Sequence, residues 1–178
     1  MTDFERAIVR SFNRYFDSED HEMLSGFAMR DQQSEYQKQV TDVIVFKPDV
    51  FIECKALKTA SAGGVGFRSH FNTEDEDSKH QIERETEILN KTGFKGALGL
   101  ELKRGRGKSR KAYLIDWSFL FQRWDDDQEP NSIRFHELED LCETEEEVEV
   151  PTAIRIPREG GQYRITSEIY EWLHQIHG

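Results

Sequence analysis

The chain begins with an apolar pattern of helical period. Phe or Ile stands at every fourth position from 4 to 16, the spacing at which side chains share one face of an α-helix. The sequence therefore predicts an amphipathic helix over residues 2–16. After a polar loop, the run FAMR at 27–30 predicts a short strand.

Two β-rich runs of equal length follow, TDVIVF at 41–46 and VFIECK at 50–55. They are separated by Lys47, Pro48 and Asp49, and the last two are strong turn formers. The pattern predicts a β-hairpin with a two-residue turn at Pro48 and Asp49.

The next segments complete an αβββαββ order. Residues 59–77 hold three glycines and an acidic run without periodicity, which indicates a long loop. Ser78, followed by Gln81, predicts a capping box and a helix to about residue 90. Two further strands, expected at 96–102 and 111–117, give an α/β fold with a central mixed sheet flanked by helices.

The last third of the chain has a different character. A short helix is expected just after Trp117, and an acidic segment at 143–149 has no capacity to form a core. A hairpin around Gly160 and Gly161 and a C-terminal amphipathic helix follow. We therefore expect a core over 1–124 and a small α+β appendage over 125–178.

Charge is unevenly distributed along the 178 residues. The formal net charge is −11, but residues 1–116 carry 19 Lys and Arg against 20 Asp and Glu, and residues 117–178 carry 5 against 15. Within the nearly neutral part, 103–111 reads KRGRGKSRK. Such a run either contacts phosphates beside a site or forms a solvated hairpin tip. The six cations are Lys103, Arg104, Arg106, Lys108, Arg110 and Lys111.

The chain lacks the signals of a membrane or secreted protein. No apolar run approaches the roughly 20 residues that span a bilayer. Two cysteines, Cys54 and Cys142, stand without ligand spacing or a secretory segment. A soluble protein in a reducing cytoplasm is expected.

The candidate chemistry lies in the predicted hairpin. Glu53 and Lys55 are two apart in one strand, so they point to the same face. A two-residue turn would place Asp42 opposite Lys55 and on that face too, and a one-residue slip would remove it. Two carboxylates beside an ammonium favour Mg²⁺, with Mn²⁺ as a substitute. The alternative is a cross-strand ion pair on a solvated sheet face.

A magnesium site of this kind suits phosphodiester hydrolysis. Asp42 and Glu53 would hold Mg²⁺, which acidifies a water molecule and stabilises the developing charge, and Lys55 would orient or deprotonate that water.

Short motifs in the same order resemble the archaeal Holliday junction resolvases of the PD-(D/E)XK nuclease superfamily: FER at 4–6, GFAMR at 26–30, Asp42 and IECK at 52–55. The resemblance covers about residues 4–116. It implies a restriction-endonuclease-like core, with Glu5 as a third acidic residue at the metal and Arg30 on a backbone phosphate.

Two further residues enter through weaker similarities. Ser34 matches a loop serine of the archaeal family, although the loop before Asp42 is longer here. The stretch from Glu53 to His80 and Gln81 is similar to the bacterial resolvases related to recombination factor U, and it suggests an accessory role for Gln81 besides capping.

The resemblance implies a DNA endonuclease that cuts four-way junctions as a twofold homodimer. Two alternatives remain: a sequence-specific restriction or repair endonuclease with the same chemistry, and a non-catalytic nucleic-acid-binding or adaptor module. The acidic C-terminal part suggests a surface for a protein partner.

Overall fold

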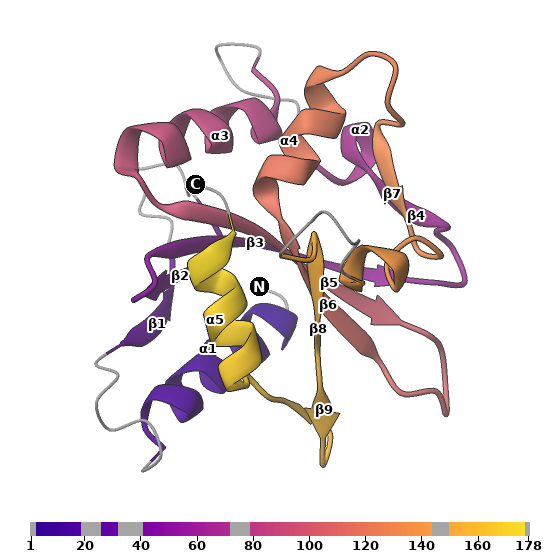
Figure 1. Ribbon diagram of the computed structural model, residues 1–178. Helices are drawn as coiled ribbons and strands as arrows, with labels where there is room; N and C mark the ends of the chain where they lie inside the picture. Colours follow the sequence, from indigo (N-terminus) through magenta and orange to yellow (C-terminus); the bar gives the residue numbers. More distant parts are fainter. Residues whose placement is uncertain (1–2, 19–25, 32–40, 72–78, 144–149, 177–178) are drawn as a thin grey trace.

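The computed structural model describes residues 3–18, 26–31, 41–71, 79–143 and 150–176, and a six-stranded sheet with helices on both faces forms its centre (Figure 1). The helices are α1 (Asp3–Phe16), α2 (Phe67–His70), α3 (Gln81–Thr92), α4 (Trp117–Asp125) and α5 (Ser167–Gln175), with a 3-10 turn at Asp140–Cys142. The strands are β1 (Phe27–Arg30), β2 (Val43–Phe46), β3 (Val50–Lys58), β4 (Gly64–Gly66), β5 (Lys95–Lys103), β6 (Lys111–Asp116), β7 (Ser132–Arg134), β8 (Ala153–Ile156), β9 (Arg158–Glu159) and β10 (Gln162–Tyr163).

The central sheet is mixed, as predicted. Its strand order is β1-β2-β3-β5-β6-β8. Strands β3 and β5 run parallel, with α3 in the crossover between them, and every other neighbouring pair is antiparallel. The predicted helix at 2–16, the strand at 27–30 and the hairpin of the two later strands are confirmed as α1, β1 and the β5–β6 pair.

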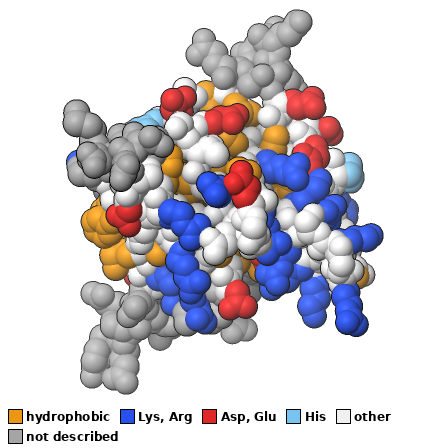
Figure 2. Space-filling view, turned by 90° about the horizontal axis from the view of Figure 1, so that it is seen from below, with side chains coloured by type: hydrophobic (Ala, Val, Ile, Leu, Met, Phe, Trp, Pro, Cys, Tyr) orange, Lys and Arg blue, Asp and Glu red, His pale blue; other side chains and the backbone are white. Residues whose placement is uncertain are grey.

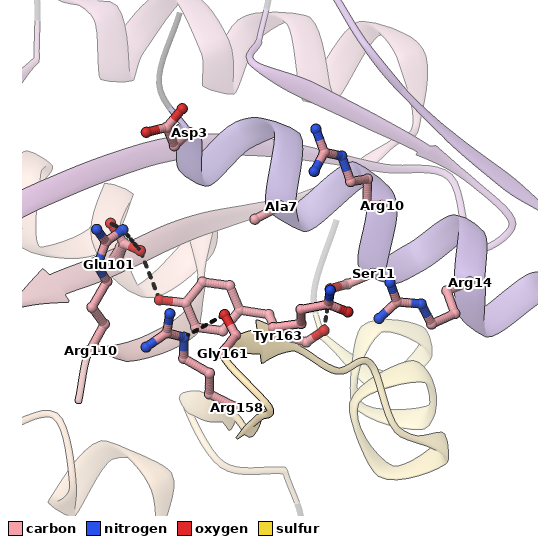
Figure 3. A pocket seen from close by; sticks show the side chains of 11 residues that line it. Asp3, Ala7, Arg10, Ser11, Arg14, Glu101, Arg110, Arg158, Gly161 and Tyr163 are labelled. Carbon is pink, nitrogen blue, oxygen red and sulfur yellow. Dashed lines mark hydrogen bonds and ion pairs between the residues drawn. The ribbon is translucent and has the colours of Figure 1, made fainter.

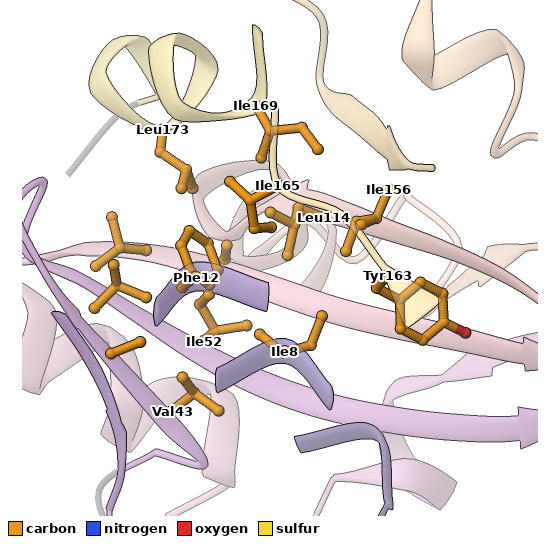
Figure 4. Packing of buried hydrophobic residues seen from close by; sticks show 14 of the residues in the cluster. Ile8, Phe12, Val43, Ile52, Leu114, Ile156, Tyr163, Ile165, Ile169 and Leu173 are labelled. Carbon is orange, nitrogen blue, oxygen red and sulfur yellow. The ribbon is translucent and has the colours of Figure 1, made fainter. Parts of the chain in front are cut away.

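Two apolar cores hold the helices on the sheet. The first packs α1 and α5 against one face, where Ile8 and Phe12 meet Leu173 and sheet residues such as Ile52 (Figure 4). The second lies between the other face and α3, α4 and β7. Both faces of the sheet are therefore covered in its middle, which accounts for the continuous apolar character of β5 and β6.

A glycine lets the second helical layer approach closely. A Cβ atom at Gly96 in β5 would lie 2.5 Å from Leu89 Cδ1 and 2.6 Å from Trp117 Cβ. The absence of a side chain at Gly96 thus lets α3 and α4 pack directly on the strand.

The C-terminal part differs from the expected appendage. Strand β8 pairs with β6 and forms the sixth strand of the central sheet. Tyr163, Ile165 and the apolar face of α5 belong to the same core as α1. The Gly160–Gly161 turn is present, but it joins the two-residue strands β9 and β10, whereas β8 pairs with β6. Residues 144–149 of the predicted acidic linker lie outside the described part.

The β2–β3 hairpin has a wider turn than predicted. The last pair is Val45 with Val50, so four residues form the turn and the register is displaced by two positions. A tight two-residue turn of the favoured primed type needs positive φ at its first central position, which the ring of Pro48 forbids. A shift of two residues preserves the face on which each side chain lies, because the period of a strand is two.

Two smaller predictions are also revised. Helix α3 starts after His80, whose ring accepts from the Ile82 N–H while Glu83 bonds back to the His80 N–H. The expected cap Ser78 lies outside the described residues. The segment 59–77, expected to be loop, contains β4 and α2 in its described portion.

None of the described helices is both long and apolar enough to cross a membrane.

Candidate functional site

The residues that the sequence predicts at the metal and catalytic site lie together at one end of the central sheet. Arg30 ends β1, Asp42 directly precedes β2, and Glu53 lies in the middle of β3. The first turn of α1 supplies Glu5, and α3 begins with Gln81. Five elements thus bring these side chains together, although their positions span nearly eighty residues of sequence.

Asp42 continues the β2–β3 pairing by one step. Since Val43 pairs with Ile52, Asp42 stands opposite Glu53, not opposite Lys55 as the two-residue turn predicted. Its Oδ2 accepts a hydrogen bond from the Cys54 N–H at 2.7 Å. The three polar groups therefore share the expected face, with a different partner across the strands.

The environment of Asp42 disfavours its ionised form. Burial and the nearby carboxylates of Glu53 and Glu5 raise its pKa from 3.8 to about 7, against the opposing effects of the Cys54 N–H and the Lys55 ammonium. A bound cation would stabilise the ionised form of such an aspartate, which lies beside two other carboxylates.

Glu53 and Lys55 form a close pair on this face. Lys55 Nζ lies 2.5 Å from Glu53 Oε1, and the same oxygen accepts from Gln81 Nε2 at 2.8 Å. The Lys55 ammonium also lies 4.8 Å from the centre of the Phe71 ring. Glu53 is 5% exposed, so both the ion pair and the Gln81 contact are shielded from water.

One carboxylate of this network was not anticipated from the sequence. Glu85 is buried on α3, and Gln81 Nε2 donates to its Oε1 at 2.5 Å. Burial and the charge of Glu53 raise the pKa of Glu85 well above 4.5 and so favour its neutral form. Its spacing of four from Gln81 on a helix was the available signal, since i and i+4 side chains are neighbours.

Glu5 reaches the site from the other helical layer. It is 6% exposed, and its Oε2 pairs with Arg30 Nη2 at 3.0 Å. Helix α1 and strand β1 therefore place together the two residues that the family resemblance singled out. Ser34, the loop serine suggested by that resemblance, lies outside the described residues.

The donor set fits a hard divalent cation. Asp42, Glu53 and Glu5 offer carboxylate oxygens, which Mg²⁺ and Mn²⁺ prefer, and their mutual repulsion raises the pKa of Asp42. In the described part of the chain, however, no three acidic, histidine or cysteine side chains are already disposed around one point as a cage. At present Lys55 and Arg30 neutralise two of the carboxylates.

The basic segment lies at the same end of the sheet as the carboxylates. Lys103 closes β5 and pairs in register with Lys58, three residues beyond Lys55. Arg110 and Lys103 neutralise Glu101, Lys111 pairs with Glu139, and Arg104 bonds to Ser109. Arg106 and Lys108, at the exposed tip, have no ion pair among the described residues.

Comparison with known proteins assigns no family. No protein-family model matches the chain, and no curated protein matches its sequence.

Proposed function

We propose that the chain is a divalent-cation-dependent endonuclease that hydrolyses phosphodiester bonds in DNA. The observation that carries this proposal is the convergence of Asp42, Glu53 and Lys55 on one face, with an Asp42 pKa of about 7. Carboxylates that lie close together and are largely shielded from water repel one another, and a bound cation relieves that repulsion. The basic loop at the same end of the sheet supports a polyanionic substrate.

The chain's own residues have distinct tasks in this reaction. Asp42 and Glu53 would hold Mg²⁺, and Glu5 would add a third carboxylate from α1. When bound, the cation acidifies a water molecule and stabilises the negative charge that develops on the phosphoryl oxygens. Lys55, released from Glu53, would donate to the attacking water or to a phosphate oxygen.

Gln81 and Glu85 would act through Glu53. The Gln81 amide donates to both carboxyl groups, so it fixes one Glu53 oxygen while the other stays available. Burial and the charge of Glu53 favour the neutral form of Glu85, which adds no charge to the site. Such supporting groups typically affect metal affinity or activity by about 10- to 100-fold.

The resemblance of FER, GFAMR and IECK to archaeal resolvases supports a four-way junction as the substrate. Two symmetric cuts need two active sites, so the proposed enzyme works as a twofold homodimer. The restriction-endonuclease-like description of the core belongs to the same proposal.

Cleavage of labelled DNA tests this function. Wild type, Glu53→Gln and the exposed control Glu168→Gln on α5 are incubated with a four-way junction and a matched linear duplex, with Mg²⁺ or with EDTA. We expect symmetric junction cuts that need Mg²⁺, persist in Glu168→Gln, and fall on the order of 10³-fold in Glu53→Gln.

Each other outcome has a defined meaning. Mutant-sensitive cutting of linear duplex would support the same chemistry in a restriction or repair enzyme. If neither substrate is cut, or if Glu53→Gln cuts as well as wild type, the hydrolytic proposal fails, and DNA binding alone would then indicate the non-catalytic module.

A further inference from the structure

A second polar site lies on the α1 side of the sheet. A pocket of about 260 Å³ opens between α1 and the β9–β10 hairpin (Figure 3). Its charged lining consists of four arginines and two carboxylates: Arg10, Arg14, Arg110, Arg158, Asp3 and Glu101. Four guanidinium groups against two carboxylates give this lining a net charge of +2, in a chain whose formal charge is −11.

The buried carboxylate in the pocket is already neutralised. Glu101 is 1% exposed and accepts from Arg110 Nη1 at 3.1 Å and from the Tyr163 hydroxyl at 2.8 Å, with Lys103 Nζ at 3.7 Å. This contact occupies one nitrogen of Arg110 and fixes the side chain at the pocket wall. Within the described part of the chain, the other guanidinium donors of Arg110 make no hydrogen bond, so they are left for a ligand.

The other arginines are positioned without being neutralised. Arg158 donates from Nε to the Gly161 carbonyl at 3.0 Å and lies over the Tyr163 ring. Arg10 and Arg14 lie four apart on α1, so they are neighbours on one exposed helix face. Among the described residues, no carboxylate forms an ion pair with any of these three arginines.

The pocket belongs to a broader cationic face. Figure 2 views the molecule from below and shows many Lys and Arg side chains on this face, with few acidic side chains between them. Arg110 is both part of the pocket lining and a member of the basic segment 103–111. The cations of the β5–β6 loop therefore continue into the pocket.

We propose that this pocket binds a phosphate group of a DNA strand that passes from the hydrolytic site over α1. Guanidinium forks match the oxygen geometry of a phosphate. At about 260 Å³ the pocket is below the usual range for a small organic ligand, roughly 300–1,000 Å³. This inference rests on the proposed function, since it takes DNA as the ligand.

The distance along α1 suits a neighbouring phosphate. Glu5 lies in the first turn, and Arg10 and Arg14 follow five and nine residues later. At about 1.5 Å per residue this is roughly 8 to 14 Å along the axis. Because phosphates of one strand advance by about 3.4 Å each along a duplex, the pocket would hold one a few nucleotides from the reacting bond.

Salt-dependent DNA binding tests the proposal. The Kd for labelled junction and duplex is measured by fluorescence anisotropy in EDTA over a series of salt concentrations. The variants are Arg10→Gln/Arg14→Gln and a control with the same charge change, Lys91→Gln/Arg134→Gln, on α3 and β7 away from α1 (Figure 1). Both pairs of residues are exposed.

We expect only the pocket variant to change. Its slope of log K against log salt should become less negative by about 2, and its affinity at about 0.1 M salt should fall on the order of tenfold. An equal change in both variants, or none in either, would overturn the proposal. So would a wild type that binds no DNA.

A second measurement separates the source of the phosphate. Inorganic phosphate is titrated while the thermal unfolding midpoint is followed. Stabilisation of wild type and not of Arg10→Gln/Arg14→Gln, together with the expected change in DNA binding, supports a phosphate site used by DNA. The same stabilisation without any change in DNA binding would contradict DNA as the ligand.

The hydrolytic proposal can fail independently. If DNA binds through Arg10 and Arg14 but is never cut, the pocket stands and the nuclease does not. If DNA is cut in a Glu53-dependent way, while substitution of the two arginines leaves the slope of log K against log salt unchanged, only the pocket proposal is lost.

Discussion

Two groups of buried carboxylates lie at the same end of the sheet and differ in how they are neutralised. On the α1 side, Glu101 stands alone among Arg110, Lys103 and the Tyr163 hydroxyl. On the site side, Lys55 pairs with Glu53, and burial and the charge of Glu53 raise the pKa of the neighbouring Asp42 to about 7. The first group is a single carboxylate between two cations, whereas the second places two carboxylates side by side.

This contrast distinguishes a carboxylate that supports the fold from one that is available for chemistry. A buried charge with complete partners is consistent with a structural role. A cluster whose own repulsion and burial raise the pKa of Asp42 to about 7 is kept in an unfavourable state that a bound cation would relieve.

The largest effect is expected for Asp42→Asn. Cleavage should fall on the order of 10³-fold, because the substitution removes a proposed metal ligand. The free energy of unfolding should instead increase. The folded chain binds the Asp42 proton more tightly than the unfolded chain, so this residue's contribution to stability is lost as pH rises from about 4 to about 7.

Thermal unfolding of both proteins at pH 5 and pH 8 in EDTA measures that loss. From pH 5 to pH 8, the unfolding midpoint of Asp42→Asn should rise relative to that of wild type. Adding Mg²⁺ at pH 8 should then raise the midpoint of wild type and leave that of the variant nearly unchanged. Parallel pH profiles of wild type and variant would show that Asp42 is as well compensated as Glu101.

An intermediate effect is expected at the Gln81 bridge. Gln81→Ala removes the donor shared by Glu53 and Glu85, and cleavage should fall about 10- to 100-fold. Glu85→Gln retains an oxygen acceptor and matches the neutral form that burial and the charge of Glu53 favour, so its activity should stay within about threefold of wild type. The cleavage rate measured against Mg²⁺ concentration should show whether Gln81→Ala weakens metal affinity or the positioning of Glu53. A severe loss in Glu85→Gln would mean that Glu85 acts as a charged group.

The sequence predicted the layout of the site because its signals are local. Glu53 and Lys55 share a face by the period of a strand, and Asp42 remains on that face even though the turn at Pro48 shifted the register by two. Glu85 was missed because a single helical Glu has no distinctive pattern, and its burial depends on where α3 packs.

The C-terminal part could not be predicted in the same way. Four residues of β8 carry little pattern of their own, and their place beside β6 depends on pairing across about forty residues. The pocket combines α1, the basic loop and the β9–β10 hairpin, so its arginines are scattered in sequence. Long-range packing, which local periodicity does not encode, decides both features.

The smallest effect is expected for Glu101→Gln. The amide still accepts from Tyr163, but a charge-assisted contact becomes a neutral one, which costs about 1 kcal/mol. For a chain of this size the unfolding midpoint should fall by about 2–4 °C. Glu139 is a matched control, because it also accepts from a tyrosine and pairs with a lysine but is 48% exposed, so Glu139→Gln should cost only a few tenths of a kcal/mol. Since Glu101→Gln also frees Arg110, DNA affinity should hold or rise while stability falls; a joint loss of both would mean that Glu101 shapes the pocket rather than merely neutralising it.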